Sequence, residues 1–122
     1  MENCAENLTW GFEAIIDCKS GSDAIKDPVA IAGFCKELVK TIDMEAYGDP
    51  QIVHFGKDDK SGYTLMQLIT TSNIVVHFCD QTGDAYVNVF SCKQFQIIDV
   101  RNCLQKWFEF KSNKERFLLR GV

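Results

Sequence analysis

"YTLMQLITTSNIVVHFCDQTGDAYVNVFS", residues 63–91, is the stretch of sequence that decides the fold. Three runs within it are rich in β-branched and aromatic residues, which favour strands. These runs span residues 63–70, 73–79 and 85–91. A turn near Ser72 joins the first two runs, and the polar loop "DQTGD" at 80–84 joins the last two. Connections this short join antiparallel neighbours, so the stretch predicts three successive antiparallel strands.

A strand, a helix and a further strand are predicted before this stretch. "WGFEAIIDC" (10–18) has the composition of a strand, and "KSGSDAIKD" (19–27) that of a loop. Asp27 followed by Pro28 is typical of a helix start, and apolar residues then repeat at helical spacing until about Asp43. "QIVHF" (51–55) is predicted to be a short strand, and "GKDDKSG" (56–62) a polar turn.

A second helix and a final strand are predicted after it. Val100, Cys103, Leu104, Trp107 and Phe108 form one apolar stripe at helical spacing. "KSNKE" (111–115) is predicted to close this helix, and "RFLLRGV" (116–122) to form the last strand. The element order β-α-β-β-β-β-α-β predicts an α+β fold. We expect a two-layer α/β sandwich in which a mostly antiparallel sheet carries two helices on one face.

The composition indicates one globular domain that spans residues 1–122. The chain is 46% hydrophobic and 25% charged, as in ordinary globular proteins. Its net charge of −4 argues against a nucleic-acid-binding surface. No apolar run approaches the length of a membrane span. The opening "MENCAENLTW" does not resemble a signal peptide, so we expect a cytoplasmic protein without a membrane or nucleic-acid partner.

Six cysteines are spread along the chain, at positions 4, 18, 35, 79, 92 and 103. Without a secretion signal we expect them to be reduced, and most of them to be small buried hydrophobic residues. No pair has the C-x-x-C spacing of a metal or redox site, and neither His54 nor His77 forms a ligand cluster with them. The sequence therefore predicts no metal site.

Ser72, His77 and Cys92 are the candidate catalytic residues. Each alone has an ordinary structural explanation: a serine at a turn, a hydrogen-bonded histidine in a strand, and a core cysteine. Together, "TTSNIVVHF" and "AYVNVFSC" resemble the pyruvoyl-dependent S-adenosylmethionine decarboxylase family in its short bacterial and archaeal form. That family has a serine at an internal cleavage site, a histidine five residues on and a cysteine twenty residues on. Asp17-Cys18, "VHF" at 53–55 and "RG" at 120–121 extend the resemblance more weakly.

The resemblance implies that the chain makes its own cofactor. The Ser72 hydroxyl would attack the carbonyl of Thr71, and His77 would act as the base that eliminates the resulting ester. Hydrolysis would leave a pyruvoyl group at the start of the 72–122 fragment. A pyruvoyl carbonyl is an electron sink for decarboxylation, and the resemblance assigns reprotonation of the product carbon to Cys92.

The family also implies a substrate, a pathway and an assembly. The substrate would be S-adenosylmethionine, and the product would supply the aminopropyl donor for polyamine (spermidine) biosynthesis. The family fold is an α/β sandwich that usually pairs into a homodimer. We expect Ser72, His77 and Cys92 to face one pocket on neighbouring strands. Phe12 and Phe55 are candidates for stacking on the adenine of the substrate, although each is also a plausible core residue.

The sequence departs from the family beside the serine, where the usual glutamate and histidine are Thr71 and Asn73. The attack on the carbonyl needs a nearby hydroxyl, not a carboxylate, so cleavage between threonine and serine remains chemically sound. The missing acid removes a negative charge next to a site that would hold a cationic sulfonium. Two alternatives therefore stay open: an unprocessed homologue that binds the nucleoside or regulates a partner, and a pyruvoyl decarboxylase with a changed amino-acid substrate.

Overall fold

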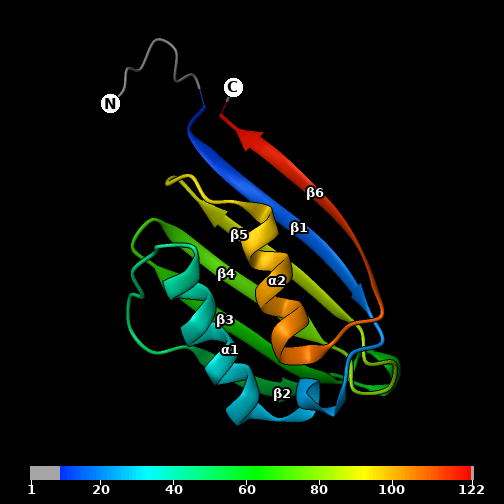
Figure 1. Ribbon diagram of the computed structural model, residues 1–122. Coiled ribbons are helices and arrows are strands. Elements are labelled where there is room, and N and C mark those ends of the chain that lie inside the picture. The colour runs from blue at the N-terminus through cyan, green and yellow to red at the C-terminus, as the bar shows by residue number, and fades with distance from the viewer. Residues whose placement is uncertain (1–8, 122) are drawn as a thin grey trace.

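Six antiparallel strands form one sheet, and two helices cover one of its faces (Figure 1). The computed structural model describes residues 9–121. The strands are β1 (Gly11–Lys19), β2 (Gln51–Phe55), β3 (Gly62–Ile69), β4 (Ser72–Phe78), β5 (Ala85–Ser91) and β6 (Ser112–Arg120). The helices are α1 (Pro28–Thr41) and α2 (Ile97–Phe108), with short 3-10 turns η1 (Asp23–Lys26) and η2 (Asp58–Lys60).

The strand order is β2-β3-β4-β5-β1-β6, so β1 lies between β5 and the edge strand β6. From β1 the chain crosses the sheet through α1 to the opposite edge, and β2 to β5 then return as consecutive antiparallel neighbours. Helix α2 carries the chain on to β6. The predicted α+β sandwich, with both helices on one face of an antiparallel sheet, is confirmed.

Helix α1 begins where the sequence predicts. The Asp27 carboxylate accepts a hydrogen bond from the Val29 N–H (2.9 Å), and Pro28 is the first helical residue. This arrangement satisfies one of the free N–H groups at the helix start, and proline has no N–H to satisfy there. The helix ends at Thr41, close to the predicted boundary at about Asp43.

The predicted end of the second helix is wrong. Helix α2 ends at Phe108 because Glu109 takes a left-handed conformation (φ 51°) and donates its N–H to the Gln105 carbonyl. The polar run 111–115 does not close the helix, because β6 already begins at Ser112. β6 is an edge strand that is exposed along almost its whole length. Solvent on both sides allows polar residues in this strand, so its composition conceals it in the sequence.

Phe108 joins both helices to the sheet. Its ring centroid lies 5.1 Å from that of Phe34 on α1 and 5.0 Å from that of Phe78 on β4. All three side chains are fully buried. Aromatic pairs at these separations add about 0.5–1.5 kcal/mol to the free energy gained from burying their area. This cluster fixes the position of α2 over the centre of the sheet.

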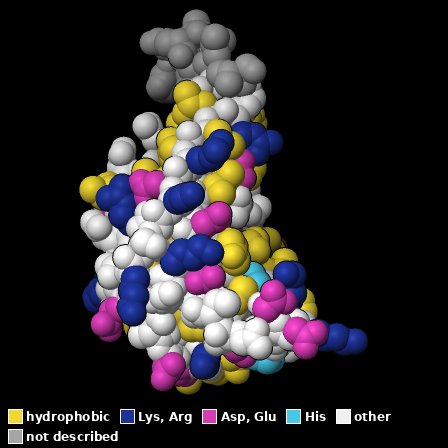
Figure 2. Space-filling view, turned by 90° about the vertical axis from the view of Figure 1, so that its right-hand side faces the viewer, with side chains coloured by type: hydrophobic (Ala, Val, Ile, Leu, Met, Phe, Trp, Pro, Cys, Tyr) yellow, Lys and Arg dark blue, Asp and Glu magenta, His cyan; other side chains and the backbone are white. Residues whose placement is uncertain are grey.

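Charged side chains occupy the open edge of the sheet. The Arg101 guanidinium on α2 donates two hydrogen bonds to the Glu115 carboxylate on β6 (2.8 and 2.6 Å). The bond from Arg101 holds the pKa of the Glu115 carboxyl below its usual range. Figure 2 shows side chains of both charges spread over this side of the molecule. Charges on an edge strand oppose pairing with a further strand.

Gly62 is predicted to tolerate no larger residue, because a Cβ there would lie 1.8 Å from the Phe78 carbonyl oxygen of the neighbouring strand. Gly62→Ala should lower the free energy of unfolding by about 3 kcal/mol, since the contact is with rigid backbone. Urea unfolding followed by circular dichroism measures this. Gly48→Ala is the matched control: its Cβ meets nothing within 4 Å and only the positive φ of 76° opposes it, so about 1 kcal/mol is expected. Equal losses in the two variants would contradict the assigned contact.

Candidate active site

The peptide bond between Thr71 and Ser72 lies where a tight turn joins β3 to β4. Ser72 pairs with Ile69 across this turn and with Ser91 on β5. The Thr71 carbonyl accepts a hydrogen bond from the backbone N–H of Cys92 (3.0 Å). The Ser72 hydroxyl oxygen accepts a hydrogen bond from the Asn73 side-chain amide (3.2 Å). The end of β5 therefore lies directly against the predicted cleavage bond.

Cys92 differs from the other cysteines in its exposure. Of the five cysteines in the described part of the chain it alone is exposed, and all five are free thiols. Burial raises the pKa of Cys35 to about 11 and is the main cause that raises those of Cys18 and Cys103 to about 12. Those three thiols stay protonated at neutral pH and act as core residues, as predicted. The exposed thiol of Cys92 follows β5 immediately, next to the Thr71–Ser72 turn.

The imidazole of His77 is held at both ring nitrogens. Nε2 lies 2.9 Å from the Lys60 carbonyl oxygen, and Nδ1 lies 2.7 Å from the Thr64 hydroxyl. A carbonyl can only accept, so Nε2 carries a proton and, in the neutral ring, Nδ1 accepts from the Thr64 hydroxyl. Nδ1 is then the basic nitrogen. The sequence analysis did not identify Thr64, because only the register of β3 against β4, which pairs it with His77, reveals the contact.

The prediction that Ser72, His77 and Cys92 face one pocket of a single chain is wrong. Ser72 lies on the helix-covered face of β4 with the buried Ile74, whereas His77 lies on the opposite face. Side chains alternate along a strand, so a separation of five residues reverses the face and adds about 16 Å. The structure thus brings Ser72 and Cys92 together at one end of β4 and β5, and leaves His77 apart from them.

His77 instead borders a cavity of its own. The cavity has a volume of about 470 Å³, and neither Ser72 nor Cys92 lines it. Besides His77 its lining residues are Asp59, Lys60, Cys79, Thr82, Asp84 and Tyr86. A base in this cavity therefore does not reach Ser72 of the same chain.

The two phenylalanines proposed for adenine stacking lie on opposite faces of the sheet. Phe12 is on the helix-covered face, where its ring stacks on Phe117 at 6.2 Å. Phe55 is on the other face, 54% exposed, with its ring centroid 6.0 Å from that of His77. Only Phe55 is placed where it could contact a ligand together with His77.

The face of the sheet opposite the helices, here called the helix-free face, exposes several large apolar side chains. By strand alternation and register they share this face with His77 and Thr64. The exposed apolar residues on it are Val53, Phe55, Met66, Leu68, Tyr86 and Leu118. Neither helix packs on this face, and within residues 9–121 the short turn η2 reaches it only beside His77.

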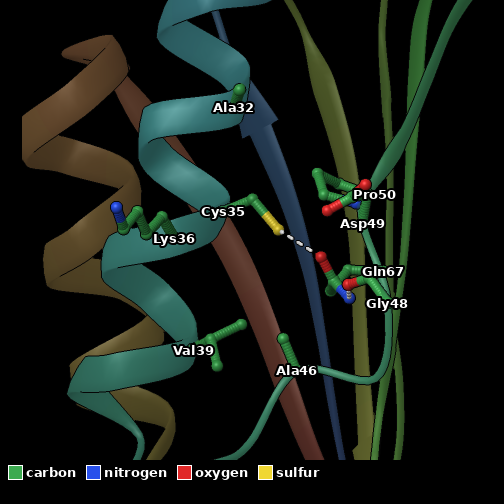
Figure 3. A pocket seen from close by; sticks show the side chains of 9 residues that line it. All are labelled: Ala32, Cys35, Lys36, Val39, Ala46, Gly48, Asp49, Pro50 and Gln67. Carbon is green, nitrogen blue, oxygen red and sulfur yellow. Dashed lines mark hydrogen bonds between the residues drawn. The ribbon is translucent and has the colours of Figure 1, made fainter.

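A separate pocket of about 410 Å³ lies between α1 and the segment that leads into β2 (Figure 3). The buried Gln67 amide forms its floor, accepts the Cys35 thiol hydrogen (3.6 Å) and donates to the Gly48 and Leu68 carbonyls. Both polar atoms of that amide have hydrogen-bond partners, and the bond to Gly48 holds the loop against β3. The pocket therefore has a structural explanation, and none of Ser72, His77 and Cys92 lines it.

Two further findings concern residues 9–121. No group of three or more histidine, cysteine, aspartate or glutamate side chains is placed to hold a metal ion. Within the same residues, no helix has both the length and the apolar character needed to cross a membrane.

Comparison with known proteins identifies the family. Residues 13–121 match the S-adenosylmethionine decarboxylase family, and the chain belongs to it. Its fold is similar to that of the crystal structure of the adenosylmethionine decarboxylase from Aquifex aeolicus VF5. The TM-score is 0.80 at 20% sequence identity, over 93% of this chain and 92% of that one. A search among curated proteins finds no match to this chain.

Proposed function

We propose that the protein decarboxylates S-adenosylmethionine with a pyruvoyl group that it makes from its own Ser72. The observation that carries this proposal is the hydrogen bond from the Cys92 N–H to the Thr71 carbonyl, which places the candidate acid residue beside the candidate cleavage bond. The Ser72 hydroxyl, the Thr71 carbonyl and the exposed Cys92 thiol belong to neighbouring residues joined by the bond from the Cys92 N–H to that carbonyl (3.0 Å). Family membership supplies the reaction, and this turn supplies the residue types that the reaction needs.

Cleavage begins with addition of the Ser72 hydroxyl oxygen to the Thr71 carbonyl carbon. The bond between that carbon and the Ser72 nitrogen then breaks, which gives an ester and a free amine. A base removes the proton on the Ser72 α-carbon, and the bond from Cβ to the ester oxygen breaks to release the Thr71 carboxylate. The dehydroalanine that remains isomerises to an imine, and water replaces its nitrogen, which leaves as ammonia. No oxidant or reductant is needed.

The pyruvoyl group supplies an electron sink when carbon dioxide leaves the substrate. During turnover Cys92 would act as the acid. It is an exposed residue at the turn, and its thiol can donate a proton to the product carbon. Decarboxylated S-adenosylmethionine would then serve as the aminopropyl donor in spermidine biosynthesis. Phe55, exposed beside His77, is the better placed of the two candidates for stacking on the adenine.

A homodimer would bring the base to the cleavage bond. His77 lies on the helix-free face, whereas the Ser72 side chain lies on the helix-covered face at the end of β4, about 16 Å along the strand. In the dimer the partner's His77 would therefore reach the Thr71–Ser72 turn around the end of the sheet. Two sheets pack face to face about 10 Å apart, a distance that side chains span. A two-fold axis gives each copy the same contacts. The six exposed apolar residues of this face favour a second copy as its cover, with His77 acting on the partner's Thr71–Ser72 bond.

We predict that the purified chain cleaves between Thr71 and Ser72. A denaturing mass spectrum should show fragments 1–71 and 72–122, the second beginning with pyruvoyl. Ser72→Ala should remain intact and inactive, while its melting temperature changes little because a small side chain at a turn is lost. A single intact species of the unaltered chain after long incubation would contradict self-cleavage and favour the unprocessed homologue. Cleavage without release of carbon dioxide from S-adenosylmethionine would favour a changed amino-acid substrate, which the loss of the glutamate charge at Thr71 could explain.

Substitutions of His77 and Cys92 should block the reaction at different stages. His77→Ala should stall as the ester, because elimination lacks its base, and hydroxylamine should then split the chain at residue 72. Cys92→Ala should lose decarboxylation by about 10² to 10⁴-fold, since general acid catalysis contributes that much. Circular dichroism of each variant controls for the fold. Two folded, processed and fully active variants would show that neither residue has its assigned role.

If the dimer shares its active sites, mixing the His77→Ala chain with a second variant should restore its cleavage. Mixed dimers of His77→Ala with Ser72→Ala contain one site that has both Ser72 and His77, so the His77→Ala chain should become processed. Met66→Lys on the helix-free face should yield monomers in analytical ultracentrifugation, whereas Val29→Lys, at a still more exposed position at the start of α1, should leave the dimer intact. A monomeric unaltered chain that still cleaves itself would rule out the shared site.

A further inference from the structure

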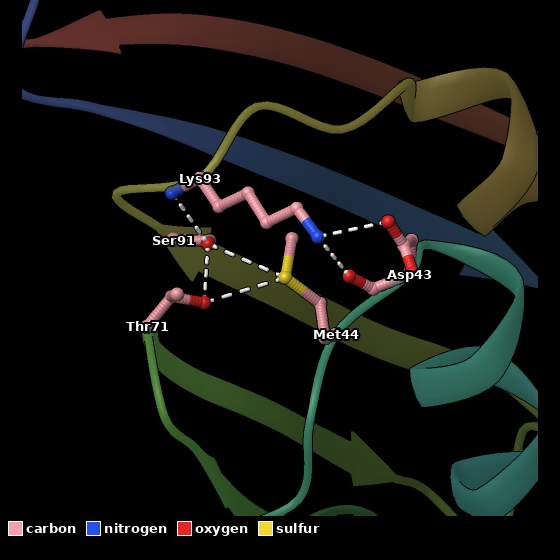
Figure 4. A network of polar contacts seen from close by, with 5 residues as sticks. All are labelled: Asp43, Met44, Thr71, Ser91 and Lys93. Atoms are coloured by element: carbon pink, nitrogen blue, oxygen red, sulfur yellow. Dashed lines mark hydrogen bonds and ion pairs between the residues drawn. The ribbon is translucent and has the colours of Figure 1, made fainter.

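A chain of hydrogen bonds runs from the residues after β5 to the side chain of Thr71 (Figure 4). The Lys93 N–H donates to the Ser91 hydroxyl oxygen (2.9 Å), and the Ser91 hydroxyl donates to the Thr71 hydroxyl oxygen (2.7 Å). The Thr71 hydroxyl in turn donates to the Met44 sulfur (3.3 Å). The Ser91 hydroxyl also lies 3.6 Å from the Met44 sulfur, but it has one hydrogen and the Thr71 oxygen is the closer acceptor. These hydrogen bonds fix the side chain of Thr71 in one orientation.

The outer members of the chain are themselves anchored. The Lys93 ammonium donates to the Asp43 carbonyl (2.6 Å) and to its carboxylate (2.9 Å), and this links the segment after β5 to the end of α1. Ser91 is completely buried, so its hydroxyl has no access to water as a replacement partner. A buried hydroxyl that both accepts and donates is costly to disturb. Ser91 is therefore the rigid member of this group.

Thr71 is consequently held at two points by consecutive residues. Ser91 holds its hydroxyl, and the Cys92 N–H holds its carbonyl at 3.0 Å. A backbone N–H that already points at a carbonyl oxygen can stabilise the negative charge that develops there. When the Ser72 hydroxyl adds to this carbonyl, the negative charge develops on the oxygen that already faces the Cys92 N–H. A rotation of Thr71 at the turn would remove the carbonyl from its donor.

We infer that Ser91 is a positioning residue for self-cleavage, which acts through Thr71 to keep the scissile carbonyl on the Cys92 N–H. The inference rests on the proposed function, because it concerns the first step of that cleavage. Thr71 stands where the family usually has glutamate. Its hydroxyl provides the attachment for Ser91, so a neutral side chain is held in place without a carboxylate.

The test removes the two ends of the Ser91–Thr71 bond separately and together. Ser91→Ala and Thr71→Val should each slow the appearance of the 72–122 fragment by about 10-fold to 100-fold, since small misplacements of reacting groups have effects of this size. The double variant should be no slower than either single one, because both substitutions break the same bond. Thr71→Ser keeps the hydroxyl and should recover most of the cleavage rate that Thr71→Val loses. Thr70→Val alters the same turn at an exposed side chain whose hydroxyl makes no hydrogen bond within residues 9–121, and it should also cleave normally.

A second measurement separates positioning from a general loss of stability. The slow variants should accumulate the uncut amide, which resists hydroxylamine, because the acyl shift is the impaired step. His77→Ala, by contrast, should accumulate the hydroxylamine-sensitive ester. Folded Ser91→Ala or Thr71→Val chains that cleave at the normal rate, or that accumulate the ester, would overturn the inference. Should Ser91→Ala fail to fold, Thr71→Val at the half-buried turn decides alone.

The unaltered chain distinguishes a failure of the proposed function from a failure of the positioning role alone. If that chain never cleaves, the proposed function is wrong, and the role of Ser91 is wrong with it. If the chain cleaves while the Ser91 and Thr71 variants match its rate, self-processing stands and only the positioning role is lost.

Discussion

The two-residue alternation of side chains along the strands is the constraint on which the core and the candidate site both depend. Only one face of the sheet is covered by helices, so every second residue of β4 and β5 packs against Phe108 and its neighbours. The remaining residues lie on the helix-free face, among them His77. One chain therefore separates its candidate nucleophile from its candidate base, and in the proposed dimer a second copy would supply the base.

Residue patterns predicted those parts of the architecture that depend on residues close together in the sequence. The run 63–91 indicated three antiparallel strands, and Asp27-Pro28 marked the start of α1, because strand composition and helix capping act between near neighbours. The start of β6 at Ser112 was not predictable from composition, since an exposed edge strand needs no apolar residues. The partnership of Thr64 with His77 depends on strand register, which the sequence does not state. The spacing of Ser72 and His77 resembles the pattern expected of the family, but its consequence for their faces follows only from the pleat of β4.

The candidate cleavage site is built from backbone groups and neutral side chains. An N–H, one hydroxyl and a thioether contact Thr71, and the ion pair between Lys93 and Asp43 is exposed and serves as an anchor. Such groups keep their hydrogen-bonding roles over a wide range of pH, since none of them ionises near neutrality. In the proposed cleavage, electrostatic support for the developing oxyanion would come from a fixed dipole, which needs no reorganisation when the charge appears. This gives a physical account of how threonine can occupy a position where relatives usually carry an acid.

The strand order has a consequence for a chain that is broken at residue 72. β1 belongs to the first fragment, yet both of its neighbours, β5 and β6, belong to the second. β3 of the first fragment is likewise bonded to β4 of the second. The strands of the two fragments would thus alternate in groups within one sheet. The fragments could separate only if three ladders of hydrogen bonds were broken: β3 with β4, β5 with β1, and β1 with β6. Such a protein would migrate and melt as one body in native conditions, and its cut would become visible only in a denaturant.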